Sequence, residues 1–154
     1  MGRLRNEGNL DPVDLRILRL LAEDARASVA EIARAVRMSP PSVSERIRRL
    51  QENGTIESYT IRINPAAFSL PLAAWLRIRP VPGGLERVTE MIKATPEIVS
   101  CDRVTGEDCF IAKVVVRSVG HLEAVIDRII PYAMTNTAVV QSSPVAPRLP
   151  DIGA

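Results

Sequence analysis

The stretch SVAEIARAVRMSPPSVSERIRRLQENG, residues 28–54, decides the fold of the first part of the chain. Ser28 and Glu31 have the spacing of a capping box, which predicts the start of a short helix. Ser39 predicts the start of a second helix, because serine is a favoured N-cap and the proline after it, Pro40, is tolerated in a first turn. Two short helices joined by a tight turn, the second rich in arginine, are typical of a helix-turn-helix motif.

The segment before this motif predicts one more helix. Asp11 can cap a helix that opens at Pro12. Apolar residues then recur at helical spacing, at Val13, Ile17, Leu20 and Leu21. One side of this helix would be buried against the two helices that follow, so we expect a three-helix unit.

The second helix of the motif has an apolar side and a polar side. Val43, Ile47 and Leu50 fall within about 60° of one another, and the polar residues point away from them. A helix in the major groove presents its N-terminal residues to base edges while flanking cations meet phosphates. We therefore assign base contacts to Ser42, Ser44 and Glu45 and phosphate contacts to Arg46, Arg48 and Arg49, with Ser39 and Pro41 on the same surface. The alternative is a small helical bundle with a solvated basic face.

The distribution of charge favours a nucleic-acid partner. Residues 1–64 contain 11 Lys and Arg against 9 Asp and Glu, whereas residues 65–154 contain 9 of each, so the first part carries the whole net charge of +2. The stretch Val36–Leu50 alone contains four arginines and one acid. A local surplus of positive charge attracts phosphates.

The chain changes character after the arginine-rich helix. Thr55–Ile63 alternates apolar and polar residues, which predicts a strand or hairpin that would serve as a wing or a tether. Asn64–Pro65 and Leu70–Pro71 break regular structure, so we expect a linker at residues 64–71. The predicted domains are a winged helix-turn-helix of three helices plus short strands at 1–63 and a second domain at 72–154.

The second domain has a different periodicity. Its predicted elements are a strand at 72–79, a helix from Leu85, strands at 98–105 and 109–117, a helix capped by Ser118, and a strand at 137–143. This βαββαβ order is that of a ferredoxin-like sandwich, which makes the chain α+β. The runs IAKVVV and TAVVQ are apolar on both sides, so the sheet face without helices needs cover. A second copy of the chain is the simplest cover.

Several classes of protein are disfavoured by the sequence. Cys101 and Cys109 are too few for a disulfide framework and lack the partners of a zinc site, so we expect no metal and no cofactor. No apolar run reaches the roughly 18 residues of a membrane span, and the first residues lack the apolar stretch of a signal peptide. We expect a cytoplasmic protein without a membrane partner. No nucleophile and base are patterned for catalysis, so we expect no enzyme.

Three separated stretches resemble the Lrp/AsnC (leucine-responsive, feast/famine) family of prokaryotic transcriptional regulators. They are LDPVDLRILRLLAEDAR (10–26), ASVAEIARAVRMSPPSVSERIRRLQENGTIESYTIRINP (27–65) and VTGEDCFIAKVVV (104–116). The resemblance implies a winged helix-turn-helix joined to an αβ sandwich that dimerises through its sheet, often with further assembly of dimers. It also implies that a small molecule, usually an amino acid, binds in the second domain where dimers meet.

The resemblance places two functional segments on this chain. Ser39–Leu50 falls on the family's recognition helix. The effector loop falls on Arg103, Val104, Thr105, Gly106, Glu107, Asp108 and Cys109, with Ala138, Val139 and Val140 on the last strand lining the same pocket. The family pattern T-G-D-x-D has an acid where this chain has Cys109, and that acid is a natural partner for an effector's ammonium group. Gly106 is equally explained by a tight turn, and Cys109 by packing in the core.

The sequence thus predicts a sequence-specific, homo-oligomeric regulator that binds double-stranded DNA and responds to a small metabolite, with an amino acid expected. The alternative is an architectural DNA-binding protein without an effector, which the missing acid at Cys109 supports. An effector-dependent change in DNA affinity separates the two.

Overall fold

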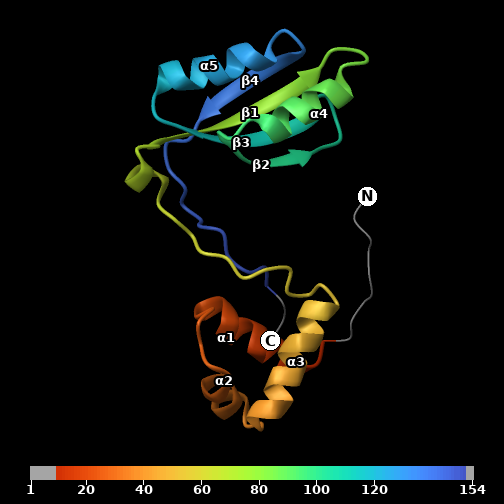
Figure 1. The fold of residues 1–154 in the computed structure, drawn as a ribbon, viewed down its shortest axis with the longest axis vertical. Helices are drawn as coiled ribbons and strands as arrows, with labels where there is room; N and C mark the ends of the chain where they lie inside the picture. The colour runs from red at the N-terminus through yellow and green to blue at the C-terminus, as the bar shows by residue number, and fades with distance from the viewer. Residues whose placement is uncertain (1–9, 152–154) are drawn as a thin grey trace. The chain divides into compact units, whose positions relative to one another are not determined.

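The computed structural model describes residues 10–151, which form two compact units. One unit contains the chain up to Arg62 together with the C-terminal segment from Pro147, and the other is Ile63–Ala146 (Figure 1). Leu149 and Pro150 line a hollow of the first unit with Leu18 and Tyr59. The predicted domain of residues 72–154 therefore differs from the second unit at both ends.

The first unit contains the three predicted helices, α1 (Pro12–Glu23), α2 (Val29–Val36) and α3 (Pro40–Glu52). The predicted caps are confirmed: the side chains of Asp11, Ser28 and Ser39 each accept a backbone hydrogen bond from the first turn of their helix. These bonds satisfy N–H groups that a helix leaves unpaired. The apolar sides of the three helices meet in one core of Ile17, Ile32, Ala33, Val43 and Leu50.

The strand or hairpin predicted at Thr55–Ile63 is wrong, because these residues form no strand in the structure. Alternation alone cannot make a strand without a partner to complete the hydrogen-bonded ladder. Tyr59, Ile61 and Ile63 are accordingly exposed. The predicted linker is also more regular than expected, since it contains a short 3-10 helix, η1 (Pro65–Phe68), capped by Asn64.

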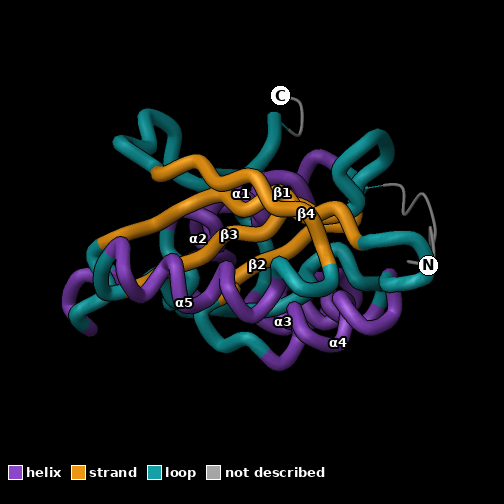
Figure 2. The backbone as a smooth tube through the Cα atoms, turned by 90° about the horizontal axis from the view of Figure 1, so that it is seen from above, coloured by secondary structure: helices purple, strands orange, loops and turns teal. Residues whose placement is uncertain are grey.

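The second unit has the predicted βαββαβ order. Its elements are β1 (Leu72–Pro80), α4 (Leu85–Ala94), β2 (Ile98–Arg103), β3 (Phe110–Val116), α5 (Val119–Ile129) and β4 (Ala133–Val139). The strands form one antiparallel sheet in the order β2-β3-β1-β4. Both helices lie on the same side of this sheet (Figure 2). The ferredoxin-like prediction is confirmed.

Alternate residues of the central strands make the core under the helices. Ala74, Leu76 and Ile78 of β1 are fully buried and pack with Val125 and Ile129 of α5. The last strand begins at Ala133, four residues before the predicted start at Thr137, so the predicted boundaries of this strand are wrong. As an edge strand β4 is largely exposed, and the polar residues in its middle interrupt the apolar pattern by which a strand is recognised in a sequence.

Candidate nucleic-acid interface and ligand loop

One side of α3 is free to meet a partner. Pro41, Ser44, Glu45 and Arg48 lie on it, while Val43 and Leu50 are buried on the other side. Arg48 forms ion pairs with Glu45 and with the acid one turn further on, Glu52. The hydrogen bond from Arg48 lowers the pKa of Glu45, and the same bond raises the pKa of Arg48. Both residues stay charged at neutral pH and can exchange their partners for those of a ligand.

The start of α3 uses two of the predicted contact residues for capping. Ser39 Oγ accepts the Ser42 backbone N–H at 3.4 Å and lies 2.8 Å from Ser42 Oγ. Ser42 is half-buried, whereas Ser44 is exposed. Ser44 is therefore better placed than Ser42 for a base contact, and the assignment of both stays a prediction.

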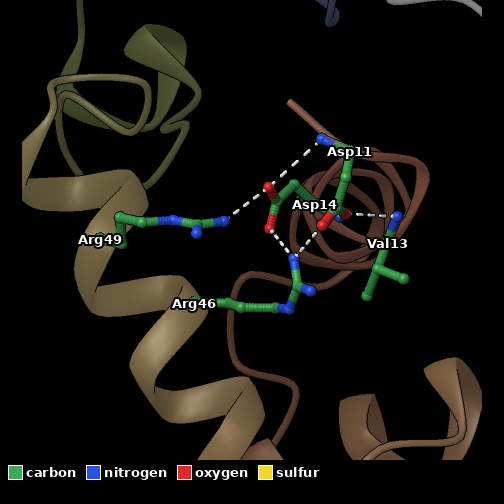
Figure 3. Close-up of polar contacts among 5 residues, drawn as sticks. All are labelled: Asp11, Val13, Asp14, Arg46 and Arg49. Carbon is green, nitrogen blue, oxygen red and sulfur yellow. Dashed lines mark hydrogen bonds and ion pairs between the residues drawn. The ribbon is translucent and has the colours of Figure 1, made fainter. Parts of the chain in front are cut away.

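Two of the helix arginines turn toward α1 (Figure 3). Arg46 Nη1 lies 2.8 Å from Asp14 Oδ1 and also contacts the Asp11 carboxylate. Arg49 Nη2 lies 2.8 Å from Asp14 Oδ2. The side chain of Arg46 is only 23% exposed, against 55% for Arg49 and 58% for Arg48. The predicted phosphate contact fits Arg48 best and Arg46 least, because the charge of Arg46 is already paired inside the unit.

The turn between α2 and α3 contains a strained residue that the sequence does not reveal. Arg37 ends α2 in the left-handed conformation, with φ 57° and ψ 46°, which glycine usually adopts there. Its backbone N–H bonds back to α2. Arg37 lies in the turn just before the start of α3, so it adds a cation to this end of the motif.

The predicted effector loop is the turn between β2 and β3. Gly106 has φ +106°, a conformation that L side chains rarely adopt, and the Val104 N–H donates to the Cys109 carbonyl at 2.9 Å. The tight-turn explanation of Gly106 is therefore sufficient. Cys109 is half-buried and packs against the core under the helices.

Both acids of this turn are paired with arginines of β1. Glu107 Oε2 lies 2.6 Å from Arg79 Nη2, and Asp108 Oδ2 lies 3.5 Å from Arg77 Nε. These arginines alternate with the buried residues of β1, so they lie on the face of the sheet without helices. Asp108 thus faces the side opposite to Cys109 and cannot simply take over the position of the missing acid.

The structure does not bring the whole predicted effector site together within one chain. Ala138 and Val139 pair with Trp75 and Ala74, and Val140 bonds to the Ala73 carbonyl, near the start of β1. The β2–β3 turn lies beyond the other end of β1, past Ile78, which pairs with the first residue of β3. Along β1, Ala74, which pairs with Val139, and Ile78, which pairs with Phe110, are four residues apart, a distance of about 13 Å. Within one chain the two sets lie apart, because the chain direction of β4 carries its last residues away from the turn. Their meeting in one pocket where dimers join stays a prediction.

The face of the sheet without helices, here the outer face, is partly apolar. It carries Ala73, Trp75, Arg77, Arg79, Ile111, Lys113, Val115, Met134 and Ala138. Trp75 is 42% exposed and Met134 69%. A groove of about 740 Å³ lies at one end of the face between η1, the start of β2 and the end of β3, with Phe68, Val99 and Val115 among its lining residues. Such a surface is typical of an interface.

Two features are absent from the described residues, a cluster of metal ligands and a membrane-spanning helix. Within residues 10–151 no group of three or more His, Cys, Asp and Glu side chains could hold a metal ion. No helix in that range is long and apolar enough to cross a membrane. His121 is held by Glu97, whose Oε1 lies 3.1 Å from His121 Nε2.

A helix-turn-helix unit followed by a ferredoxin-like unit defines a two-domain DNA-binding regulator, and known proteins share this architecture. Residues 10–51 match the AsnC-type helix-turn-helix domain and residues 73–150 match the Lrp/AsnC ligand binding domain. The HTH-type transcriptional regulator LrpC of Bacillus subtilis is 35% identical over 86% of this chain and 92% of its own length. LrpA of Mycobacterium tuberculosis is 35% identical over 78% of this chain and 81% of its own length.

Solved structures agree with these sequence matches. The structure of B. subtilis LrpC has a TM-score of 0.85 at 33% identity, covering 90% of this chain and 99% of that one. A feast or famine regulatory protein from M. tuberculosis, complexed with L-methionine, has a TM-score of 0.84 at 31% identity, covering 91% and 97%. The chain belongs to the Lrp/AsnC family of transcriptional regulators. It is a DNA-binding regulator of that type.

Proposed function

We propose that this regulator binds duplex DNA through the exposed side of α3, as a homodimer joined at the outer faces of two sheets, and that it responds to an amino acid. The observation that carries the proposal is the two-sided build of α3. Its apolar side is buried in the helical core, while Ser44, Glu45 and Arg48 remain accessible on the other side. The proposed DNA contacts keep the eight residues assigned from the sequence, with Arg48 foremost for phosphate.

The ion pairs of Arg48 suggest how DNA contact is made. A phosphate can replace the carboxylates that Arg48 now meets, because a guanidinium binds both with the same geometry. Release of Arg48 leaves Glu45 able to accept a hydrogen bond from the amino group of a cytosine in the major groove. Phosphate binding and base reading would then be coupled through these neighbouring side chains.

A second copy of the chain is the proposed cover for the outer face. The exposed Trp75, which pairs with the groove residue Lys113, and the exposed Met134, toward the other end of the same face, favour burial against another apolar surface. A two-fold interface is self-complementary, so one face can serve both partners. Further assembly of dimers is proposed as well. The separation of the β2–β3 turn from Ala138–Val140 within one chain supports a ligand pocket built from more than one copy.

The proposed effector is a free amino acid. Asp108 and Arg77 carry opposite charges 3.5 Å apart at the edge of the outer face. A zwitterion can satisfy both, its ammonium group pairing with Asp108 and its carboxylate with Arg77. The L-methionine complex of the related M. tuberculosis protein supports this class of ligand. The alternative, an architectural protein without effector, is favoured by Cys109 packing in the core and by the acids of the turn being already paired.

Two further proposals concern activity and location. The chain is expected to have no enzymatic activity, because its relatives are named as transcriptional regulators. It is also expected to be cytoplasmic, where such a regulator meets DNA.

The experiment is a selection followed by titration. Duplexes bound by the purified chain are enriched from a random pool, and the affinity for the enriched duplex is measured with and without each of the common amino acids. Enrichment of one sequence motif, and a change in its affinity with at least one amino acid, are expected. If no motif is enriched, the DNA-reading proposal is contradicted. If a motif is enriched but no amino acid changes the affinity for it, the architectural alternative is favoured.

A further inference from the structure

A buried carboxylate joins the first helix to the recognition helix. Asp14, in the first turn of α1, is 1% exposed, and it is one of two buried polar residues in the described part of the chain. Its Oδ1 lies 2.8 Å from Arg46 Nη1 and its Oδ2 lies 2.8 Å from Arg49 Nη2 (Figure 3). Its Oδ2 also accepts the Asp11 backbone N–H at 3.4 Å. A buried charge needs such partners to be tolerated.

The cluster is balanced in charge. Asp11 and Asp14 face Arg46 and Arg49, two acids against two bases. The pKa of Asp11 is lowered by the hydrogen bond from the Asp14 backbone N–H and by the bond from Arg46, and the pKa of Arg46 is raised by its bonds to both acids. The pairing of Asp11 with Arg46 is therefore maintained over the neutral range.

The geometry of the cluster fixes the rotation of α3. Arg46 and Arg49 are three residues apart, so their side chains lie roughly 60° from each other around the helix axis, on one side of α3. Ser44 and Arg48 are each two residues from Arg46 and lie about 160° away from it, on the opposite side. A single carboxylate that binds both Arg46 and Arg49 therefore holds the opposite side of α3 outward.

We infer that Asp14 is a positioning residue for DNA recognition: by binding Arg46 and Arg49 it sets the rotation of α3 that presents Ser44 and Arg48 to the major groove. This inference rests on the proposed DNA contact of α3. Base-edge contacts carry the sequence information and depend on how the helix is rotated in the groove, whereas contacts to phosphate carry no sequence information. Loss of Asp14 should therefore reduce the preference for the correct sequence more than the binding of any sequence.

The test compares two duplexes, the one enriched by the wild-type chain and a scrambled duplex of equal composition. Asp14→Asn keeps the size of the side chain and removes the charge. Its ratio of affinities for the two duplexes should fall about tenfold or more, as expected when one good base contact per site is removed. Ile17→Val, one turn further along α1 at a fully buried position, is the matched control, because it weakens the same core without touching an arginine.

Two further variants keep the test decisive. Asp14→Glu restores the charge and should recover part of the wild-type ratio. Arg49→Gln leaves Asp14 paired with Arg46, so it remains informative if Asp14→Asn does not fold, and it should also lower the ratio. If the ratio of affinities for the two duplexes in Asp14→Asn and in Arg49→Gln lies within about twofold of the ratio in Ile17→Val, the inference is overturned. Failure of the wild-type chain to enrich any duplex would instead contradict the proposed function itself.

Discussion

Replacing Arg48 with glutamine should lower the salt dependence of DNA binding while leaving the fold intact. Arg48 lies on the exposed side of α3, and its ion pairs to Glu45 and Glu52 are themselves exposed. Such pairs contribute little to stability, so the unfolding transition should hardly move. Removing one phosphate contact reduces the slope of log K against log salt concentration by about 0.9. A dimer carries two copies of Arg48, so the slope should decrease in magnitude by about 1.8.

The size of this change makes it measurable. Between about 50 and 200 mM salt, a slope smaller by about 1.8 corresponds to an affinity loss about twelvefold smaller than that of the wild type. Fluorescence anisotropy with the enriched duplex, at several salt concentrations, gives the slope directly. Lys93→Gln is the matched control, because Lys93 is also an exposed helix cation paired with an acid three residues away. A slope unchanged in Arg48→Gln, or equally changed in the control, would refute the phosphate contact.

Four more results are expected. Asp108→Ala should weaken amino-acid binding about 30- to 150-fold in calorimetry without changing effector-free DNA binding, and equal affinities would end the ammonium-partner proposal. Ser44→Ala and Glu45→Gln should change the motif enriched from a random pool more than the overall affinity, and an unchanged motif would exclude both from base reading. Trp75→Glu should convert the dimer to a monomer in light scattering, and a persistent dimer would place the interface elsewhere. The pKa of Asp11 is lowered by the hydrogen bond from the Asp14 backbone N–H and then by the bond from Arg46. The ionised Asp11 carboxylate should therefore contribute its full stabilisation above about pH 4, and this contribution should be lost at lower pH. Chemical denaturation at about pH 3 and about pH 6 should show this loss in the wild type and a smaller one in Asp11→Asn, and equal losses would argue against it.

Local signals are sufficient to predict most of the fold. Asp11, Ser28 and Ser39 act within one turn of their own helices, so their side chains can be recognised as caps from spacing alone. The βαββαβ order follows from periodicity in the same way, because Ala74, Leu76 and Ile78 alternate on a half-buried strand.

The features that sequence reasoning misses depend on partners distant in the sequence. The alternation in Thr55–Ile63 predicts a strand, yet no second strand in the described structure pairs with it. The start of β4 is misplaced because an exposed edge strand has no clear apolar pattern. Spacing cannot reveal such pairings.

The candidate site can be predicted in its segments and not in its contacts. The exposed side of α3 follows from helical periodicity, but the binding of Asp14 to Arg46 and Arg49 joins residues 32 and 35 positions apart. In the sequence Asp14 is recognisable only as a residue of the first turn of α1. The pairing of Asp108 with Arg77 is equally non-local, and it changes the chemistry expected of the ligand loop.

The most direct test of the account is a hydroxyl-radical and methylation footprint of the enriched duplex with the full chain. A dimer that inserts one α3 into each half-site should protect two major-groove segments about one helical turn, or a multiple of it, apart, related by approximate two-fold symmetry. In Asp14→Asn, the protection of guanine N7 in both segments should be lost while the protection of the DNA backbone is retained. A single protected segment, or uniform backbone protection without base protection in the wild type, would contradict the claim that this chain reads DNA as a dimer through α3.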